Sequence, residues 1–267
     1  MTRRSHQVII HRAPVRGIDA MELASNHSFP RHTHDEYGIG VVLSGAQRSW
    51  SGVGQVESLP GDVITVNPGE LHDGIPINDS VRRWRIIYFA PTVLAREFMA
   101  EAIREIEFVS PSLRDPALGG RVNLLFDRLT GGADRLGVEE TLIEVMRHLV
   151  SPDAQSLDEA RRPPPAVAKA RARIDDDPSS QITLSELAAL SGVSRYQIVR
   201  AFARELGVTP HAYVVQCRVR LVRRFLLQGE TLAAAAQCAG FADQSHMTRA
   251  FVRQFGMTPG RYLAAHN

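Results

Sequence analysis

The stretch FADQSHMTRAFVRQFGMTPGRYL, residues 241–263, decides the fold because an earlier stretch repeats its pattern. The earlier stretch is VSRYQIVRAFARELGVTPHAYV, residues 193–214. Thr183-Leu184 matches Thr231-Leu232 and Gly192 matches Gly240 at an offset of 48, whereas Gly207-Val208-Thr209-Pro210 matches Gly256-Met257-Thr258-Pro259 at 49. The extra residue follows the first glycine, where a turn absorbs a change of length. The C-terminal part of the chain is therefore an internal repeat of two similar units.

Each copy has the pattern of a short helix, a tight turn and a second helix. The first helices are predicted over residues 184–191 and 232–239. Gly192 or Gly240 then supplies the left-handed backbone that ends a helix. The other markers are the N-cap candidates Ser194 and Asp243, the closing glycines Gly207 and Gly256, and the small residues Ala188, Ala189, Ala235 and Ala236, which let helices cross closely. The sequence predicts two helix-turn-helix units, whose second helices can lie in the DNA major groove.

The second helix of each unit carries polar side chains on its predicted outer face. Arginine can bond guanine with two hydrogen bonds, glutamine can bond adenine, and threonine or tyrosine can contact a thymine methyl or a phosphate. A merely solvated face is the alternative for a single copy, but the repeat and the positive charge favour DNA contact. The predicted DNA-binding residues are Arg195, Tyr196, Gln197 and Arg200 in the first copy and Gln244, Ser245, His246, Thr248 and Arg249 in the second.

One continuous helix, predicted over residues 210–229, joins the two units and would fix the distance between their second helices. A distance of about one turn of DNA, roughly 34 Å, would let both enter successive major grooves. Arg218, Arg220, Arg223 and Arg224 on this helix are candidates for phosphate contacts, which position a protein without specifying sequence.

The charge of the chain is unevenly distributed. The length of 267 residues favours two domains, and 44% hydrophobic with 22% charged residues is typical of a globular protein. Residues 1–162 hold 18 Lys plus Arg against 22 Asp plus Glu, a net of −4, whereas residues 163–267 hold 13 against 7, a net of +6. Only the basic C-terminal part is therefore expected to meet a polyanion.

A polar stretch that ends in three prolines separates the two parts. We predict an N-terminal domain over residues 1–151, a linker over residues 152–165 and a DNA-binding domain over residues 166–267. No apolar run approaches the roughly 20 residues of a membrane span, and the first residues lack signal-peptide features, which indicates a cytoplasmic protein. Cys217 and Cys238 lack metal-type spacing and are predicted to be small core residues in a reduced compartment.

The N-terminal part changes its period near Pro91. Between Phe29 and Phe89, Tyr37, Ile39, Val41 and Leu43 alternate with other residues and turn signals recur, which predicts a β-sandwich or small barrel. Helices are then predicted over residues 92–106, 117–129 and 137–150. The second and third of these helices each carry an apolar stripe, which belongs either to the core or to a dimer seam. The stripes consist of Leu118, Val122, Leu125 and Leu129, and of Val138, Leu142, Val145 and Leu149.

The pattern G-F-x-D-Q-S-H-x-x-R-x-F-x-x-x-F-G-x-T-P-x-x-Y, which Gly240–Tyr262 matches without a gap, resembles the AraC-type transcriptional regulators. The resemblance is specific over the last hundred residues. It implies a double helix-turn-helix domain, a cupin-like sensor barrel over about residues 15–90 that binds a small effector, and often a dimer contact on the helices after the barrel. By position, DNA contacts fall on Tyr196, Arg200, Gln244, Ser245, Thr248 and Arg249.

Histidines of the N-terminal part resemble the cupin metal pattern. The residues are His32, His34 and Glu36, at period two on one predicted strand, and His72 after Pro68-Gly69. The preferred interpretation is an effector pocket, with Gly38 and Gly40 leaving room for a ligand and Trp50, Trp84 and Tyr88 as apolar walls. A divalent-metal site is the second, since three imidazoles and a carboxylate suit zinc, iron or manganese. Glu36 departs from the cupin pattern, because the cupin glutamate lies further beyond the second histidine. Ordinary hydrogen-bonded histidines at the mouth of the barrel are the third interpretation.

These features predict an α+β two-domain protein, a cupin-like β-barrel with following helices and an all-α domain of two helix-turn-helix units. We expect a sequence-specific transcriptional regulator that binds double-stranded DNA and a small effector, forms a homodimer, has RNA polymerase as a further partner and performs no covalent chemistry. The alternative is a metal-dependent cupin enzyme with a DNA-binding tail, which needs His32, His34 and His72 to converge on a metal with an open position. A non-sensing DNA binder would leave the N-terminal domain without a role.

Overall fold

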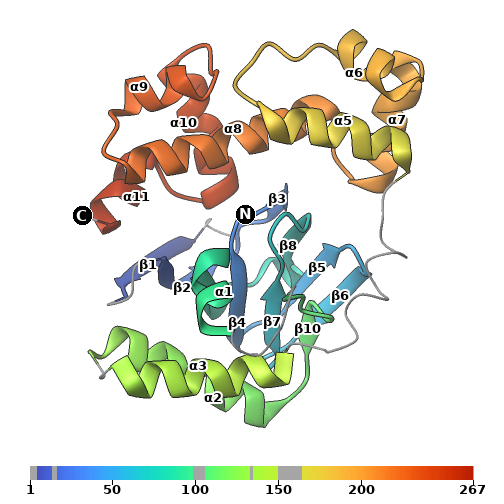
Figure 1. Ribbon diagram of the computed structural model, residues 1–267. Helices are drawn as coiled ribbons and strands as arrows, with labels where there is room; N and C mark the ends of the chain where they lie inside the picture. The colour runs from blue at the N-terminus through green and yellow to red at the C-terminus, as the bar shows by residue number, and fades with distance from the viewer. Residues whose placement is uncertain (1–4, 14–16, 99–105, 133–134, 150–163, 267) are drawn as a thin grey trace. The chain divides into compact units, whose positions relative to one another are not determined.

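The computed structural model describes residues 5–13, 17–98, 106–132, 135–149 and 164–266. The chain forms two compact units, Met1–Leu157 and Asp158–Asn267 (Figure 1). Most of the predicted linker, residues 152–163, lies outside the described residues. Its last residue, Pro165, is the first residue of a helix, because proline is well suited to a first helical turn.

The first unit is rich in antiparallel β-structure. The strands are β1 (His6–Arg12), β2 (Ile18–Ser25), β3 (Phe29–His32), β4 (Tyr37–Ser44), β5 (Gln47–Ser51), β6 (Gly54–Ser58), β7 (Val63–Val66), β8 (His72–Pro76), β9 (Arg82–Phe89) and β10 (Ser112–Leu113), with a 3-10 turn, η1 (Ile77–Asp79). They form a six-stranded sheet in the order β1-β2-β9-β4-β7-β10 and a four-stranded sheet in the order β3-β8-β5-β6. The predicted β-rich fold is confirmed, and it begins earlier than Phe29 because β1 and β2 complete the larger sheet.

Strand β4 lies between β9 and β7 and is buried on both faces. Ile39 and Val41 face the core that the following helices share, whereas Val42 packs in a second cluster with Ile64 and Trp84. The alternation predicted from sequence identified only the first of these faces. Leu43, assigned to the buried face, is 37% exposed at the end of the strand.

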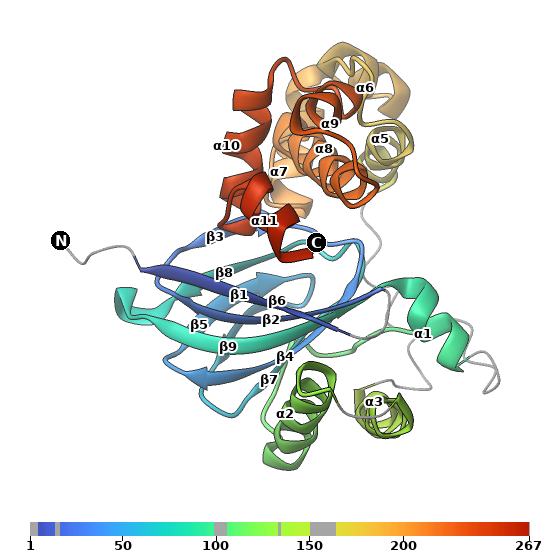
Figure 2. The ribbon, with the colours of Figure 1, turned by 90° about the vertical axis from the view of Figure 1, so that its left-hand side faces the viewer.

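In the described part of this unit, the helices α1 (Pro91–Phe98), α2 (Pro116–Thr130) and α3 (Arg135–Leu149) come after β9, and β10 lies between α1 and α2. Helices α2 and α3 cover one face of the larger sheet (Figure 2). Helix α1 covers the start of the predicted helix over 92–106, of which residues 99–105 lie outside the described part. All eight residues of the two apolar stripes are buried against the sheet and each other, so they form core rather than a dimer seam.

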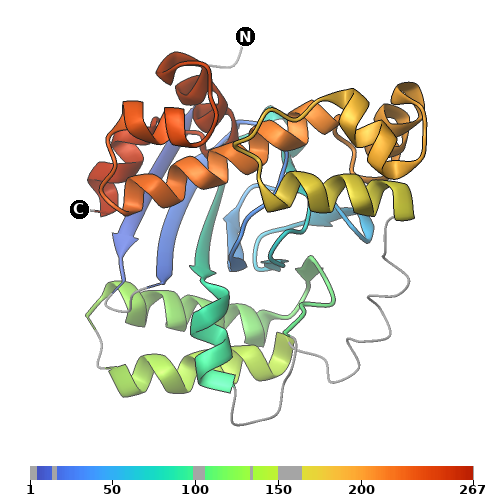
Figure 3. The ribbon, with the colours of Figure 1, turned by 45° about the horizontal axis from the view of Figure 1, so that its top comes forward.

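The second unit is helical. Its elements are α5 (Pro165–Asp176), α6 (Leu184–Ser191), α7 (Arg195–Glu205), α8 (Pro210–Leu227), α9 (Leu232–Cys238), α10 (Gln244–Phe255) and α11 (Pro259–His266). Helix α8 runs through the unit, with α6 and α7 at one end and α9 and α10 at the other (Figure 3). Gly192 and Gly240 have φ angles of 68° and 79°, so both take the predicted left-handed conformation. The two helix-turn-helix units and the joining helix are confirmed.

Two details of the predicted helix packing were wrong. Ala188, Ala235 and Ala236 are buried at helix crossings, but Ala189 lies on the outer face of α6 and is exposed. Cys217 is buried, whereas Cys238 is exposed at the end of α9 and is not a core residue. Among the described residues, no helix has both the length and the apolar character that a membrane span requires.

Candidate DNA-binding surface and histidine cluster

Helix α10 has one buried face and one polar outer face. Asp243 caps its N-terminus, because Oδ1 accepts a hydrogen bond from the backbone N–H of His246 at 2.6 Å. Met247 and Phe251 are fully buried on the inner side. Of the predicted contact residues, Gln244, Ser245 and Arg249 are exposed, whereas His246 and Thr248 are half-buried. The helix therefore exposes Gln244, Ser245 and Arg249 as the sequence predicted, whereas His246 and Thr248 are partly covered.

Helix α7 begins with a reciprocal capping box. Ser194 Oγ accepts from the backbone N–H of Gln197 at 3.2 Å, and Gln197 Oε1 accepts from the N–H of Ser194 at 2.8 Å. Gln197 is exposed, but its carbonyl oxygen is engaged at the helix terminus. This contact competes with the two hydrogen bonds to adenine predicted for Gln197.

Tyr196 and Arg200 form a pair on the exposed face of α7. Arg200 Nη1 donates to Tyr196 Oη at 3.2 Å, and the guanidinium lies 5.5 Å from the centre of the ring. Tyr196 is 68% exposed, which is unusual for a large aromatic side chain. Arg195, the first residue of the helix, is also exposed. A flat ring and a planar cation thus stand together on the outer face.

The arginines of α8 differ in their surroundings. Arg218 donates to the carbonyl oxygens of Pro178, Ser180 and Gly240 at 2.8, 2.9 and 2.6 Å. Arg223 Nε donates to Tyr262 Oη at 2.6 Å. These two residues join parts of the unit, as does Arg220, whereas Arg224 is exposed and remains a candidate for a phosphate contact.

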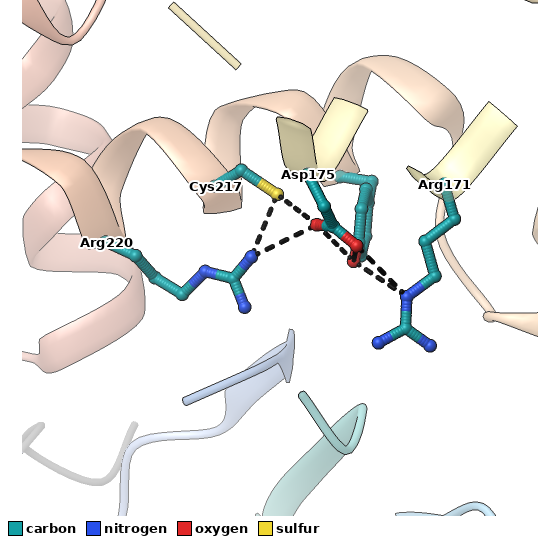
Figure 4. A network of polar contacts seen from close by, with 5 residues as sticks. Arg171, Asp175, Cys217 and Arg220 are labelled. Carbon is teal, nitrogen blue, oxygen red and sulfur yellow. Dashed lines mark hydrogen bonds and ion pairs between the residues drawn. The ribbon is translucent and has the colours of Figure 1, made fainter. Parts of the chain in front are cut away.

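A polar network between α5 and α8 involves Arg220 (Figure 4). Tyr213 Oη donates to Asp175 Oδ1 at 2.9 Å, and Arg171 and Arg220 both pair with the same carboxylate at 3.4 Å. Burial raises the pKa of the Cys217 thiol to about 12, so the thiol stays protonated and can donate to Asp175. The network attaches α5 to the joining helix and leaves no reactive thiolate.

His32, His34 and His72 come together in the first unit. His32 ends β3 and pairs in register with His72, the first residue of β8. One possible ligand atom from each ring lies within 4.8 Å of the others. His34 lies in the turn after β3, so the prediction of one strand carrying His32, His34 and Glu36 was wrong, and Glu36 is outside the cluster. The chain turn nevertheless brings the three imidazoles to one place.

Backbone carbonyls orient two of these rings. His32 Nδ1 lies 2.7 Å from the carbonyl oxygen of Pro30, and His72 Nδ1 lies 3.1 Å from that of Glu70. A carbonyl oxygen only accepts, so Nδ1 carries the hydrogen in both rings and Nε2 has the lone pair. Burial, together with the neighbouring His72, lowers the pKa of His32 to about 3, and burial lowers the pKa of His72 to about 4. Both rings are neutral at pH 7.

Carboxylates near the cluster are engaged elsewhere. Asp73 accepts from the backbone N–H of Trp50 at 2.7 Å and pairs with Arg31 at 3.5 Å. Glu70 accepts from the backbone N–H and the side-chain amide of Asn67. The cluster is therefore a set of imidazole nitrogens with no carboxylate among the grouped ligand atoms of the described residues.

One of the predicted pocket walls, Trp84, already contacts other side chains of this unit. Trp84 packs in the cluster of Phe29 and lies under the guanidinium of Arg82 at 4.8 Å. A Cβ at Gly40 would lie 2.4 Å from the carbonyl oxygen of Arg85. Gly40 thus permits close pairing of β4 with β9, and the prediction that it leaves room for a ligand was wrong.

Comparison with known proteins agrees with this architecture. The AraC-like ligand binding domain matches residues 15–146, and a helix-turn-helix domain matches residues 187–265. This chain belongs to the AraC family of transcriptional regulators. Its N-terminal domain is the ligand-binding domain of such a regulator, and its C-terminal domain is the helix-turn-helix DNA-binding domain.

Relatives of this AraC-family chain are named as regulators. It is 29% identical over 229 residues to the uncharacterized HTH-type transcriptional regulator YbfI of Bacillus subtilis, covering 82% of this chain and 81% of YbfI. It is 40% identical over 88 residues to the transcriptional activator NphR of Rhodococcus, covering 33% of this chain and 26% of NphR. ToxT from Vibrio cholerae O395 shares the two-domain fold, with a TM-score of 0.55, 14% identity and 98% of each chain covered.

Proposed function

We propose that this AraC-family regulator binds a two-part DNA site through α7 and α10, each in its own major groove. The observation that carries the proposal is the exposed polar face that both helices present while their opposite faces are buried. Ile198 and Phe202 of α7, and Met247 and Phe251 of α10, are fully buried. Such a helix can enter the groove without disturbing its own packing.

We assign base contacts to Arg249, Gln244 and Ser245 of α10 and to Arg200 and Tyr196 of α7. Arg249 can donate two hydrogen bonds to one guanine, and Gln244 can pair with an adenine. His246 and Thr248 are half-buried, so they suit contacts to DNA groups that lie close to the helix. Arg195, at the start of α7, and Arg224, on α8, suit phosphate oxygens, which position the domain without specifying sequence.

We also propose that a small effector in the N-terminal domain regulates this binding, with His32, His34 and His72 in its site. An effector changes DNA affinity only by its different affinities for two states of the protein. A homodimer is part of this proposal: Leu124 of α2 and Leu136 of α3 are 44% and 65% exposed and would be covered by a second copy. RNA polymerase is the further partner, and no covalent chemistry is involved.

A comparison of two arginines on α10 tests the assignment of base contacts. Arg249 and Arg253 are both exposed, but Arg253 lies in the last turn, away from the capped end. Arg249→Ala is expected to weaken binding to the selected site by roughly 10- to 100-fold and binding to unrelated DNA much less. Arg253→Ala should change both affinities by the same small factor. Equal losses on the two DNAs for Arg249→Ala would contradict the base contact.

A further inference from the structure

The histidine cluster has the arrangement of a preorganised metal site, because hydrogen bonds orient its rings without a metal. Two of its rings donate Nδ1–H to backbone carbonyls, of Pro30 and of Glu70, which turns each Nε2 lone pair away from the backbone. Metal-bound histidines nearly always have such a second hydrogen bond, which fixes the tautomer and the orientation of the ring. The ring centres of His32 and His72 are 4.5 Å apart, and those of His34 and His72 are 5.1 Å apart.

We propose that His32, His34 and His72 bind one divalent transition-metal ion of the zinc type, and that this ion is the effector of the N-terminal domain. The inference rests on the proposed function and names the chemical class of its effector. Three imidazole nitrogens suit zinc, cobalt, nickel or copper, whereas magnesium and calcium prefer oxygen ligands. With three protein ligands, at least one position remains for water or an anion.

Metal binding requires a small contraction of the cluster. The ligand atoms lie within 4.8 Å of one another, and Zn–N bonds of about 2.0–2.1 Å would place two tetrahedral ligands roughly 3.4 Å apart. His32 is fixed by its strand, while His34 stands in the turn that follows. The ion would therefore draw the turn between β3 and β4 toward β8, giving the domain a metal-bound and a metal-free state.

The cluster also suits reversible binding of the metal ion rather than its permanent retention. His32 and His34 are each 7% exposed, but His72 is half-buried and gives an ion a path to the cluster. No carboxylate of the described residues belongs to the group, so the ligand atoms themselves do not neutralise the charge of the ion. A site with three imidazole ligands and an accessible edge can exchange its ion, as a sensor must.

The first test measures metal binding by the full-length protein after dialysis against a chelator. Co²⁺ should produce visible d–d absorption with one ion per chain, and calorimetry with Zn²⁺ should give the same stoichiometry. His34→Gln and His72→Gln should each lower the affinity at least about 100-fold, because losing a ligand costs more than the 10- to 100-fold of an outer-shell change. Glu36→Gln and His148→Gln, a carboxylate outside the cluster and an exposed histidine on α3, should bind Zn²⁺ like the unmodified protein.

Folding of the variants is checked without metal. In chelator, each variant should match the circular dichroism spectrum and urea midpoint of the unmodified protein. Zn²⁺ should then raise the melting temperature of the unmodified protein and of His148→Gln but not of His72→Gln, because only a bound ion stabilises the fold. Equal Zn²⁺ affinity in all variants, or no binding by the unmodified protein, would overturn the metal site.

The second test separates the effector role from DNA binding itself. Affinity for a selected DNA site is measured in chelator and in Zn²⁺, and the ion should change it by at least about 5-fold, the lower end of typical allosteric coupling. His72→Gln should show no such response. A bound ion with unchanged DNA affinity would overturn the effector role, whereas absence of any preferred DNA sequence in either condition would overturn the proposed function instead.

Discussion

Arg218 donates a hydrogen bond from Nη1 to the carbonyl oxygen of Gly240 at 2.6 Å. Gly240 ends the first helix of the second helix-turn-helix unit, and the same guanidinium also reaches carbonyls of Pro178 and Ser180, which precede the first unit. A Cβ at Gly240 would lie 2.3 Å from the carbonyl oxygen of Ser179. One side chain on α8 thus joins the segment that precedes the first unit to the end of the first helix of the second unit.

Replacement of this arginine should destabilise the helical unit. Arg218→Ala leaves three carbonyl groups without their charged donor, and we expect a loss of about 2–3 kcal/mol in unfolding free energy. Urea unfolding followed by circular dichroism measures it. Arg224→Ala, an exposed arginine on the same helix, should change the stability by less than about 0.5 kcal/mol. Equal effects of the two substitutions would contradict the structural role of Arg218.

The two glutamines at the starts of the recognition helices should behave differently. Gln197→Ala removes one half of the capping box and should cost about 1 kcal/mol of stability. Gln244→Ala removes an exposed side chain outside a capping box and should lower DNA affinity with little loss of stability. Urea unfolding and DNA titration of both variants test this contrast, which fails if Gln197→Ala alters base preference at unchanged stability.

Tyr196→Phe should change DNA binding without changing the fold. The substitution removes the hydroxyl that accepts from Arg200, and both residues are exposed, so unfolding free energy should stay within about 0.5 kcal/mol. The released guanidinium should alter sequence preference only in the half of the site that α7 contacts. Selection of DNA sequences with this variant measures the change, and an altered preference in both halves would disagree with independent recognition helices.

Gly40 should tolerate no larger residue. A Cβ there would meet the carbonyl oxygen of Arg85 at 2.4 Å, which forces β4 away from β9. Gly40→Ala should therefore destabilise the first unit by at least about 2 kcal/mol. Gly52→Ala, where the added Cβ meets nothing within 4 Å, is the matched control and should have little effect. Thermal unfolding of both variants would show whether the close strand approach is needed.

The helical unit was predictable because its sequence signals are local. Glycines with positive φ, caps at Ser194 and Asp243 and the spacing of the repeat each determine a turn or a helix end. The Ser-x-x-Gln spacing of the capping box was also present, yet Gln197 was assigned only to base contact. The side chain of an exposed glutamine suits either a helix cap or a base contact, so its chemistry alone does not show which of the two the folded helix uses.

The packing of the N-terminal unit was less predictable because it depends on contacts between distant residues. The sequence placed His34 and Glu36 on one strand, but the strand ends at His32 and the following turn determines which side chain reaches His72. Similarly, the hydrogen bonds of Arg218 require three carbonyl oxygens that come from two other segments of the chain. Residue spacing alone gives no information about such partners.

The most direct test of the central claim is selection of binding sites from a random DNA pool by the full-length protein at fixed physiological salt. Fixed salt is essential because phosphate contacts alone can produce tight binding. We predict a motif of two short blocks about one helical turn, roughly 10 base pairs, apart. Enrichment of a single block, or of no sequence at all, would contradict a regulator that reads DNA through both α7 and α10.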